Sequence, residues 1–270
     1  MTTSASDGDR AEPSWIARLL TLERTADDFV FRKPEAPQGR LFGGLIAAQA
    51  LASAAATVER TKLPQSLHAY FVRAGKPDVD VTYSVARTRD GQSFDTRQVT
   101  ASQDGVVILE MIASFHMPET SVDAAPDVAP AVALADATET VKMPEMSERF
   151  EIRVPQLAAH GFASLPYWVR VRQSIEDDPV VRACALTFLS DMGLMGAAHP
   201  PGVPFAFGRG MAASLDHAIW FHRPFDPSRW HIYDADQLNF NDARGLAVGS
   251  LRADDGTLVA SMAQEALFRI

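Results

Sequence analysis

The sequence contains a single cysteine, Cys184, among 270 residues. One cysteine excludes an intramolecular disulfide and a zinc site built from several thiolates. So little cysteine is typical of a reducing compartment, and we expect a cytoplasmic protein. Because Cys184 lies among apolar residues with helical character, we expect a small buried side chain there and no nucleophile.

Long apolar runs and an excess of positive charge are also missing. No segment approaches the roughly 20 uninterrupted apolar residues that a membrane-spanning helix requires, because Gly, Arg or Asp breaks the longest apolar runs, so we expect no membrane span. Acidic residues outnumber basic ones by 34 to 25, and the net charge of -9 argues against binding to nucleic acid. Residues 1–13 lack a basic region followed by an apolar run, so we expect a disordered tail and no signal peptide there.

Common hydrolase motifs are absent as well. The chain has no G-x-S-x-G nucleophile elbow, no H-E-x-x-H zinc motif and no Walker motif. These absences argue against the serine hydrolases built on that elbow, against zinc peptidases and against P-loop enzymes. We expect no metal site.

An internal repeat is the most informative feature that is present. The segment 66–73 (Ser-Leu-His-Ala-Tyr-Phe-Val-Arg) reappears with insertions at 214–223, and the turn Asp104-Gly105 has a counterpart in Asp255-Gly256. Two copies are too few for a solenoid, so we expect a duplicated domain whose halves pack as a pseudo-dimer. His68 and His217 are predicted to occupy corresponding positions with a structural role.

The order of predicted elements gives the fold class. In the first half we expect a short helix in 15–24, a strand at 29–32 and an Ala-rich helix at about 45–58 that is apolar around its circumference. Four strand-like segments follow at 66–73, 79–89, 92–102 and 105–117, with hairpin signals at Asp90-Gly91 and Asp104-Gly105. A helix wrapped by an antiparallel sheet is the hotdog architecture, an α+β fold.

The second half is predicted to repeat this order after a Pro-rich linker. We expect strands near 149–154 and 168–173, a helix at about 179–195 and further strands from 212 onward. The predicted organisation is therefore an N-terminal hotdog domain at 14–117, a linker at 118–148 and a C-terminal hotdog domain at 149–270.

Several motifs together resemble one family. The chain is similar to the acyl-CoA thioesterase II family of double-hotdog proteins over almost its whole length. The matching segments are Leu41–Gly44 with Gln49, His68–Gly75, Arg89–Phe94, Ser190-Asp191, Leu215–His217, Trp220–Phe225 and Ala243–Gly245.

This resemblance implies an activity and a site. In that family a water nucleophile is held by an Asp, a Ser or Thr, and a Gln, and the matching positions are Asp191, Ser214 and Gln264. The resemblance also implies an acyl-CoA substrate, a place in fatty acid metabolism, no cofactor apart from the coenzyme A of the substrate, and a homodimer or homotetramer.

This set of residues suits thioester hydrolysis. A thiol leaving group with a pKa near 8.5 needs little protonation, so an oriented water is sufficient. Asp191 would act as general base, while Ser214 and Gln264 orient the water. Backbone amides near Gly43 and Gly44, at the start of the Ala-rich helix, are predicted to receive the developing oxyanion.

The repeat also predicts that the halves have specialised. By subtraction of the repeat offset, the counterpart of Asp191 is Gly43 and that of Gln264 is Ala113. Only Ser214 has a like partner, Ser66, so we expect one active site per chain.

Two other functions stay open at this stage. A hotdog enoyl-CoA hydratase would need a His and an Asp that converge on the acyl chain, but Asp216 and His217 are adjacent in a strand and should point to opposite faces. A catalytically inactive acyl-CoA-binding protein on the same scaffold would be expected to have lost Asp191 or Gln264, and both are present.

Overall fold

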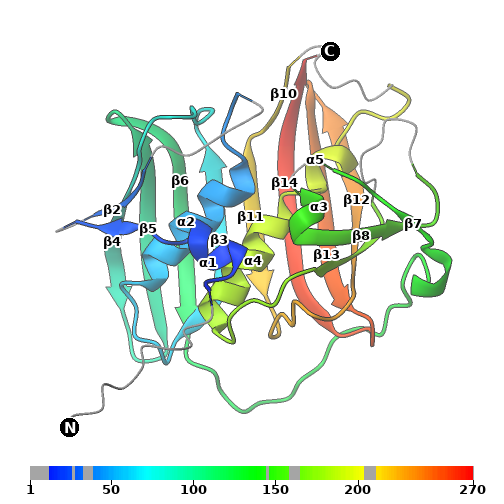
Figure 1. The fold of residues 1–270 in the computed structure, drawn as a ribbon, viewed down its shortest axis with the longest axis horizontal. Helices are drawn as coiled ribbons and strands as arrows, with labels where there is room; N and C mark the ends of the chain where they lie inside the picture. The colour runs from blue at the N-terminus through cyan, green and yellow to red at the C-terminus, as the bar shows by residue number, and fades with distance from the viewer. Residues whose placement is uncertain are drawn as a thin grey trace, which may run out of the picture.

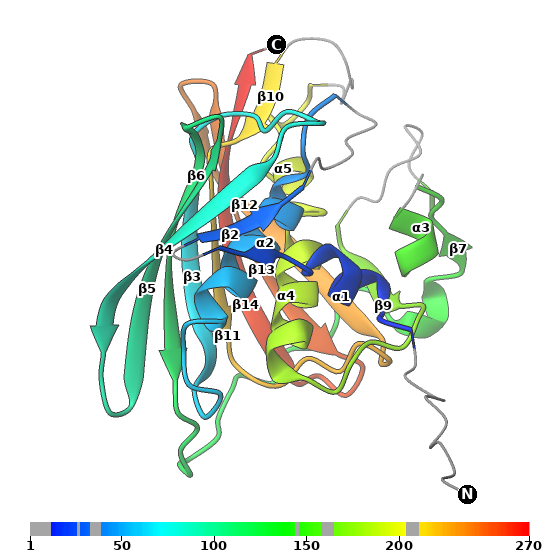
Figure 2. The same ribbon diagram turned by 60° about the vertical axis from the view of Figure 1, so that its left-hand side comes forward.

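The computed structural model describes residues 12–25, 28–32, 39–143, 146–157, 165–203 and 211–269. Its dominant feature is one large antiparallel sheet, with the helices of both halves gathered on one face (Figures 1 and 2). Almost all of the predicted tail, residues 1–13, lies outside the described part of the chain.

The predicted elements of the first half are confirmed, with boundaries shifted by a few residues. The short helix ends earlier than predicted, and Glu23–Arg24 pairs with the next strand. The observed elements are α1 (Trp15–Leu19), β1 (Glu23–Arg24), β2 (Asp28–Phe31), α2 (Gly43–Ala55), β3 (Leu63–Phe71), β4 (Val81–Asp90), β5 (Phe94–Gln103) and β6 (Val106–His116). The predicted turn at Asp104-Gly105 joins β5 to β6, and both of its residues have positive φ, 49° and 75°.

In the second half, the strands near 149–154 and 168–173 are confirmed, and the segment expected to be a linker contains some regular structure. The observed elements are η1 (Leu134–Asp136), β7 (Glu139–Thr140), α3 (Met146–Arg149), β8 (Phe150–Val154), β9 (Tyr167–Val171), α4 (Pro179–Ser190), α5 (Leu194–Ala197), β10 (Met211–Ser214), β11 (Asp216–Phe221), β12 (His231–Asn241), β13 (Arg244–Ala253) and β14 (Leu258–Arg269). The helix predicted at 179–195 is interrupted, because α4 ends at Ser190 and Asp191 closes it.

The strand order of one half is the reverse of the other across the centre of the sheet. The central path runs β2-β4-β5-β6-β3 and then β11-β14-β13-β12-β9, so β3 and β11 join the halves. Their antiparallel ladder pairs Ala69 with His217 and His68 with Ala218. Figure 1 shows this junction at the middle of the sheet, behind α2 and α4.

This register corrects the expectation for the two histidines. Successive residues of a strand face opposite sides, and paired residues share a side. His217 is therefore on the buried side, whereas His68 is exposed and packs edge-to-face on Trp220 with ring centroids 5.1 Å apart. The two residues do not correspond, and only His217 faces the helices.

Helices α2 and α4 form the centre of the core. Residues Gly44–Leu51 of α2 are all buried, as are Ala183–Ser190 of α4. Asp178 caps α4 by accepting hydrogen bonds from the backbone N–H groups of Val180 and Val181, at 2.8 and 3.3 Å. The stretch Pro179–Ala197 is long and apolar enough to cross a membrane by length and composition, but half of it is buried inside this protein. Burial in the core accounts for its apolar composition.

Candidate active site

The start of α2 meets the end of α4 at the position of Asp191. The Asp191 carboxylate oxygen Oδ2 accepts a hydrogen bond from the Gly44 N–H at 2.8 Å. The contact depends on glycine, because a Cβ at Gly44 would lie 2.6 Å from the Phe188 carbonyl oxygen. The first backbone N–H groups of α2 have no partner within the helix, so a carboxylate is favoured there.

The environment of Asp191 changes its acidity. Burial raises the pKa of this carboxyl group to about 7, despite the opposing effects of the Gly44 N–H, the Gln264 amide and the charge of Arg40. A carboxyl group with this pKa is present in both protonation states near neutral pH. It therefore suits proton transfer.

Gln264 lies beside this carboxyl group, and Ser214 is bonded to Gln264. Ser214 is the last residue of β10, which pairs with β14, and Gln264 is in β14. The Gln264 Nε2 group donates a hydrogen bond to Ser214 Oγ at 2.6 Å, and the same amide lowers the pKa of Asp191 through a hydrogen bond. The structure thus brings together the three residues that the sequence singled out.

A fourth polar residue, His217, extends this group into the core. Its Nδ1 lies 2.7 Å from Gln264 Oε1, and its Nε2 lies 2.7 Å from Ser190 Oγ. The Ser190 carbonyl oxygen in turn accepts a hydrogen bond from Tyr233. Sequence reasoning left His217 outside the site, because its partners come from α4 and β14 and depend on strand register.

The structure gives Gly44 a partner that the sequence did not predict. Its N–H donates to Asp191, so the predicted oxyanion role would require this N–H to change partner. Gly43 lies against the same carboxyl group, since a Cβ there would be 2.9 Å from Asp191 Oδ2 and 3.0 Å from the Phe71 ring. Both glycines let the helix approach the carboxylate closely.

The predicted counterpart of Asp191 is wrong. Helix α4 follows β9 as α2 follows β2, so the residue after α4 corresponds to the residue after α2, which is Ala56 and not Gly43. The repeat offset was measured on strands that follow an insertion in the second half, whereas the helices precede this insertion. The same offset therefore does not apply to the helices. The counterpart of Asp191 is apolar.

Comparisons with known proteins identify the family. The family model described as the acyl-CoA thioesterase N-terminal domain matches residues 32–116, and that of the C-terminal domain matches residues 122–268. Human acyl-coenzyme A thioesterase 8 is 33% identical over 97% of this chain and 93% of its own, and Haemophilus influenzae acyl-CoA thioesterase 2 is 31% identical over 94% and 96%. The crystal structure of acyl-CoA thioesterase II TesB2 from Mycobacterium marinum has 34% identity and a TM-score of 0.78, covering 94% of this chain and 96% of that one.

The chain belongs to the acyl-CoA thioesterase II family. It is a thioester hydrolase. The family resemblance expected from the sequence motifs is therefore confirmed.

Two further candidate features of this thioesterase are its single thiol and possible clusters of metal ligands. Cys184 is fully buried, and burial raises the pKa of its thiol well above the usual range, which agrees with the prediction of an inert side chain. Within the described residues, no three His, Cys, Asp or Glu side chains are placed to hold a metal ion.

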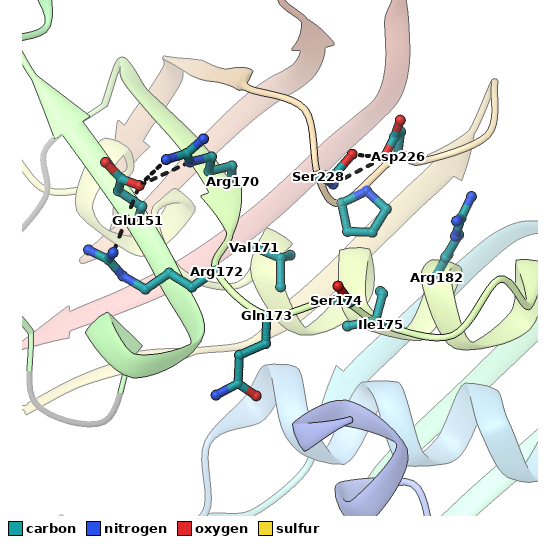
Figure 3. A pocket seen from close by; sticks show the side chains of 11 residues that line it. Glu151, Arg170, Val171, Arg172, Gln173, Ser174, Ile175, Arg182, Asp226 and Ser228 are labelled. Carbon is teal, nitrogen blue, oxygen red and sulfur yellow. Dashed lines mark hydrogen bonds and ion pairs between the residues drawn. The ribbon is translucent and has the colours of Figure 1, made fainter. Parts of the chain in front are cut away.

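A cavity of about 450 Å³ lies at the other end of α4 (Figure 3). It is lined in part by Arg182, in the first turn of α4, about 13 Å along the helix axis from Asp191. Glu151 accepts hydrogen bonds from Arg170 at 2.9 and 2.7 Å and lies 3.8 Å from Arg172, so acidic and basic groups are paired within the cavity. Its lining contains none of the residues around Asp191.

Proposed function

We propose that this thioesterase hydrolyses acyl-CoA to a free fatty acid and coenzyme A, using a water that Asp191 activates and that Ser214 and Gln264 orient. One observation carries the proposal. Asp191 has a pKa of about 7 and lies beside a glutamine amide that is itself bonded to a serine hydroxyl at 2.6 Å. A base whose pKa lies near the working pH has a large ionised fraction and is still basic enough to accept a proton from water.

The chemistry requires no covalent enzyme intermediate. The Asp191 carboxylate accepts a proton from water as the water oxygen bonds to the thioester carbonyl carbon. The tetrahedral anion then collapses with cleavage of the carbon–sulfur bond, giving the carboxylic acid and a thiolate that takes the proton from Asp191. Ser214 and Gln264 orient the water, which makes its attack effectively intramolecular.

A nucleophilic serine is a less suitable alternative. Ser190 and His217 lie within hydrogen-bonding distance, as a serine nucleophile and its base would, but Ser190 is only 2% exposed. The second imidazole nitrogen faces the Gln264 amide and not a carboxylate. The Ser190 hydroxyl also lies 2.9 Å from the Thr187 carbonyl oxygen, to which it can donate within α4.

The two remaining alternatives have less support. The hydratase reading needs Asp216 and His217 to act together, but Asp216 accepts a hydrogen bond from the Glu265 N–H while His217 points into the core. An inactive acyl-CoA-binding protein does not need a buried carboxyl group beside a serine and a glutamine.

We also propose that residues 14–117 and 149–270 form two hotdog domains that share the β3–β11 junction, with 118–148 as the connection between them. The reversed strand order of the two halves and the burial of both α2 and α4 support this arrangement. One active site per chain would then use the start of α2 from one domain and Asp191, Ser214 and Gln264 from the other.

Other proposals follow from the family. We propose a cytoplasmic enzyme of lipid metabolism that needs no cofactor and forms a homodimer or homotetramer. Tyr70 and Ile112, which are 64% and 47% exposed on neighbouring strands of the outer sheet face, provide an apolar surface for self-association. Light scattering after size-exclusion chromatography tests the oligomeric state.

Thiol release from a panel of acyl-CoAs, from short to long chains, tests the proposed function. The wild-type enzyme should show an optimum of chain length, and Asp191→Asn should lose at least roughly a hundredfold in kcat, the size expected for a general base. Asp216→Asn is the matched control, because it changes a nearby carboxylate that faces away from the core. Full activity of Asp191→Asn would rule out the general base, and no hydrolysis of any acyl-CoA by the wild type would rule out the substrate.

A further inference from the structure

His217 is buried between the active-site glutamine and the end of α4. Only 1% of the residue is exposed, and both ring nitrogens have partners at 2.7 Å, Gln264 Oε1 and Ser190 Oγ. Burial lowers the pKa of the imidazole to about 4. The ring is therefore neutral near pH 7 and carries one proton.

The chemistry of the partners determines which nitrogen carries that proton. The amide oxygen of Gln264 can only accept, so His217 Nδ1 must donate to it. Nε2 is then an acceptor, and the Ser190 hydroxyl, which also lies 2.9 Å from the Thr187 carbonyl oxygen, can donate to it. With the amide in this direction, the neutral ring has a partner on both sides.

One direction of the Gln264 amide serves both His217 and the Asp191 carboxylate. With its oxygen bonded to His217, its NH₂ group points away from the imidazole, where it donates to Ser214 Oγ at 2.6 Å and lowers the pKa of Asp191. A reversed amide would place its oxygen against the Asp191 carboxylate. It would also require the other imidazole tautomer, with the proton on Nε2 and directed at the Ser190 hydroxyl.

We propose that His217 is a positioning residue for hydrolysis, which holds the Gln264 amide with its NH₂ group toward Ser214 and Asp191. This inference rests on the proposed function, because it assigns His217 a task in the same site. His217 does not contact the reacting atoms and acts only through Gln264. Its absence should affect turnover of bound substrate more than substrate binding.

Two substitutions test this role. His217→Phe keeps a ring but removes the donor, and we expect kcat to fall roughly 10- to 100-fold with KM within about threefold of the wild type. His217→Asn keeps an N–H donor near the position of Nδ1, so it should retain kcat within roughly fivefold of the wild type. Circular dichroism confirms that each variant is folded.

A double-mutant cycle separates positioning from a merely structural role. In a Gln264→Ala background no amide remains to be positioned, so adding His217→Phe should change kcat by less than about threefold. An equal fold-loss in both backgrounds would assign His217 a structural role and overturn the inference. Wild-type kcat in His217→Phe would also overturn it. Asp191→Asn, assayed in parallel, tests the proposed function separately, because its full activity would remove the general base whatever His217 does.

Discussion

Two carboxylates near opposite ends of α2 differ in acidity. Asp95 is 2% exposed and accepts hydrogen bonds from Lys62 Nζ at 2.6 Å and from the Gly91 N–H at 3.1 Å. Burial acts to raise its pKa, but the bonds and charges of Lys62, Gly91 and Arg97 outweigh it and lower the pKa. At Asp191 burial dominates and raises the pKa to about 7. The buried ammonium group beside Asp95 accounts for the difference.

This difference separates a structural carboxylate from a reactive one. Asp95 and Lys62 belong to a compensated cluster with Arg97, whose guanidinium donates to the Thr57 hydroxyl and carbonyl oxygens just beyond α2. Asp191 has a backbone N–H and an amide but no bonded cation in the described structure. The lack of a bonded cation leaves Asp191 able to take up a proton at neutral pH.

The largest effect on stability is expected at Asp95. Asp95→Asn would leave the Lys62 ammonium buried without its counter-ion, and we expect a loss of about 3 to 5 kcal/mol in the free energy of unfolding. Asp191→Asn removes a carboxylate that has no buried counter-ion, so it should not destabilise the protein at pH 8. Urea unfolding of both variants makes the comparison, and equal losses of stability would contradict it.

A smaller effect is expected where α2 approaches α4. Gly44→Ala would place a Cβ 2.6 Å from the Phe188 carbonyl oxygen and force the helices apart, at a cost of about 1 to 3 kcal/mol in the free energy of unfolding. It should also lower kcat, because the Gly44 N–H would move away from Asp191.

Gly196→Ala is the matched control for this prediction. A Cβ at Gly196 meets no atom within 4 Å, and the residue is in helix α5, so alanine should be neutral or stabilising by up to about 1 kcal/mol. Thermal unfolding and kcat of the two variants test the packing argument. Equal behaviour of both variants would show that the close approach at Gly44 is unimportant.

The smallest effect is expected at the surface, where Arg60 pairs with Asp178 at 2.5 Å. The Arg60 side chain is 90% exposed, so Arg60→Ala should cost less than about 1 kcal/mol in the free energy of unfolding. Urea unfolding at low and high salt measures this loss. A loss as large as that of Asp95→Asn would show that burial does not explain the expected difference in stability between the two ion pairs.

Much of the fold follows from sequence pattern. The Ala-rich composition of 45–58 predicts a buried helix, and Asp104-Gly105 predicts a hairpin, because each signal is local. The sequence pattern does not predict where α4 ends, because Met192, Leu194 and Met195 continue the apolar composition beyond the last helical residue, Ser190.

The site needed more than local pattern. Asp191, Ser214 and Gln264 were found only through the family resemblance, because no spacing rule brings together a helix end and two strands. The role of His217 depends on which face of β11 it occupies. That face is set by the strand register, in which His217 pairs with Ala69 across the junction of the halves, whereas the repeat matched His217 to His68, which lies on the other face.

The pH dependence of kcat/KM for the wild type and Asp191→Asn is the most direct test of the central claim. A general base must be ionised, so kcat/KM should rise with pH through about 7 and level off above it, following the raised pKa of Asp191. In Asp191→Asn the residual activity should lose this rise. A wild-type profile that is flat from pH 5 to pH 9, or a rise that persists in Asp191→Asn, would contradict the assignment of Asp191 as the base.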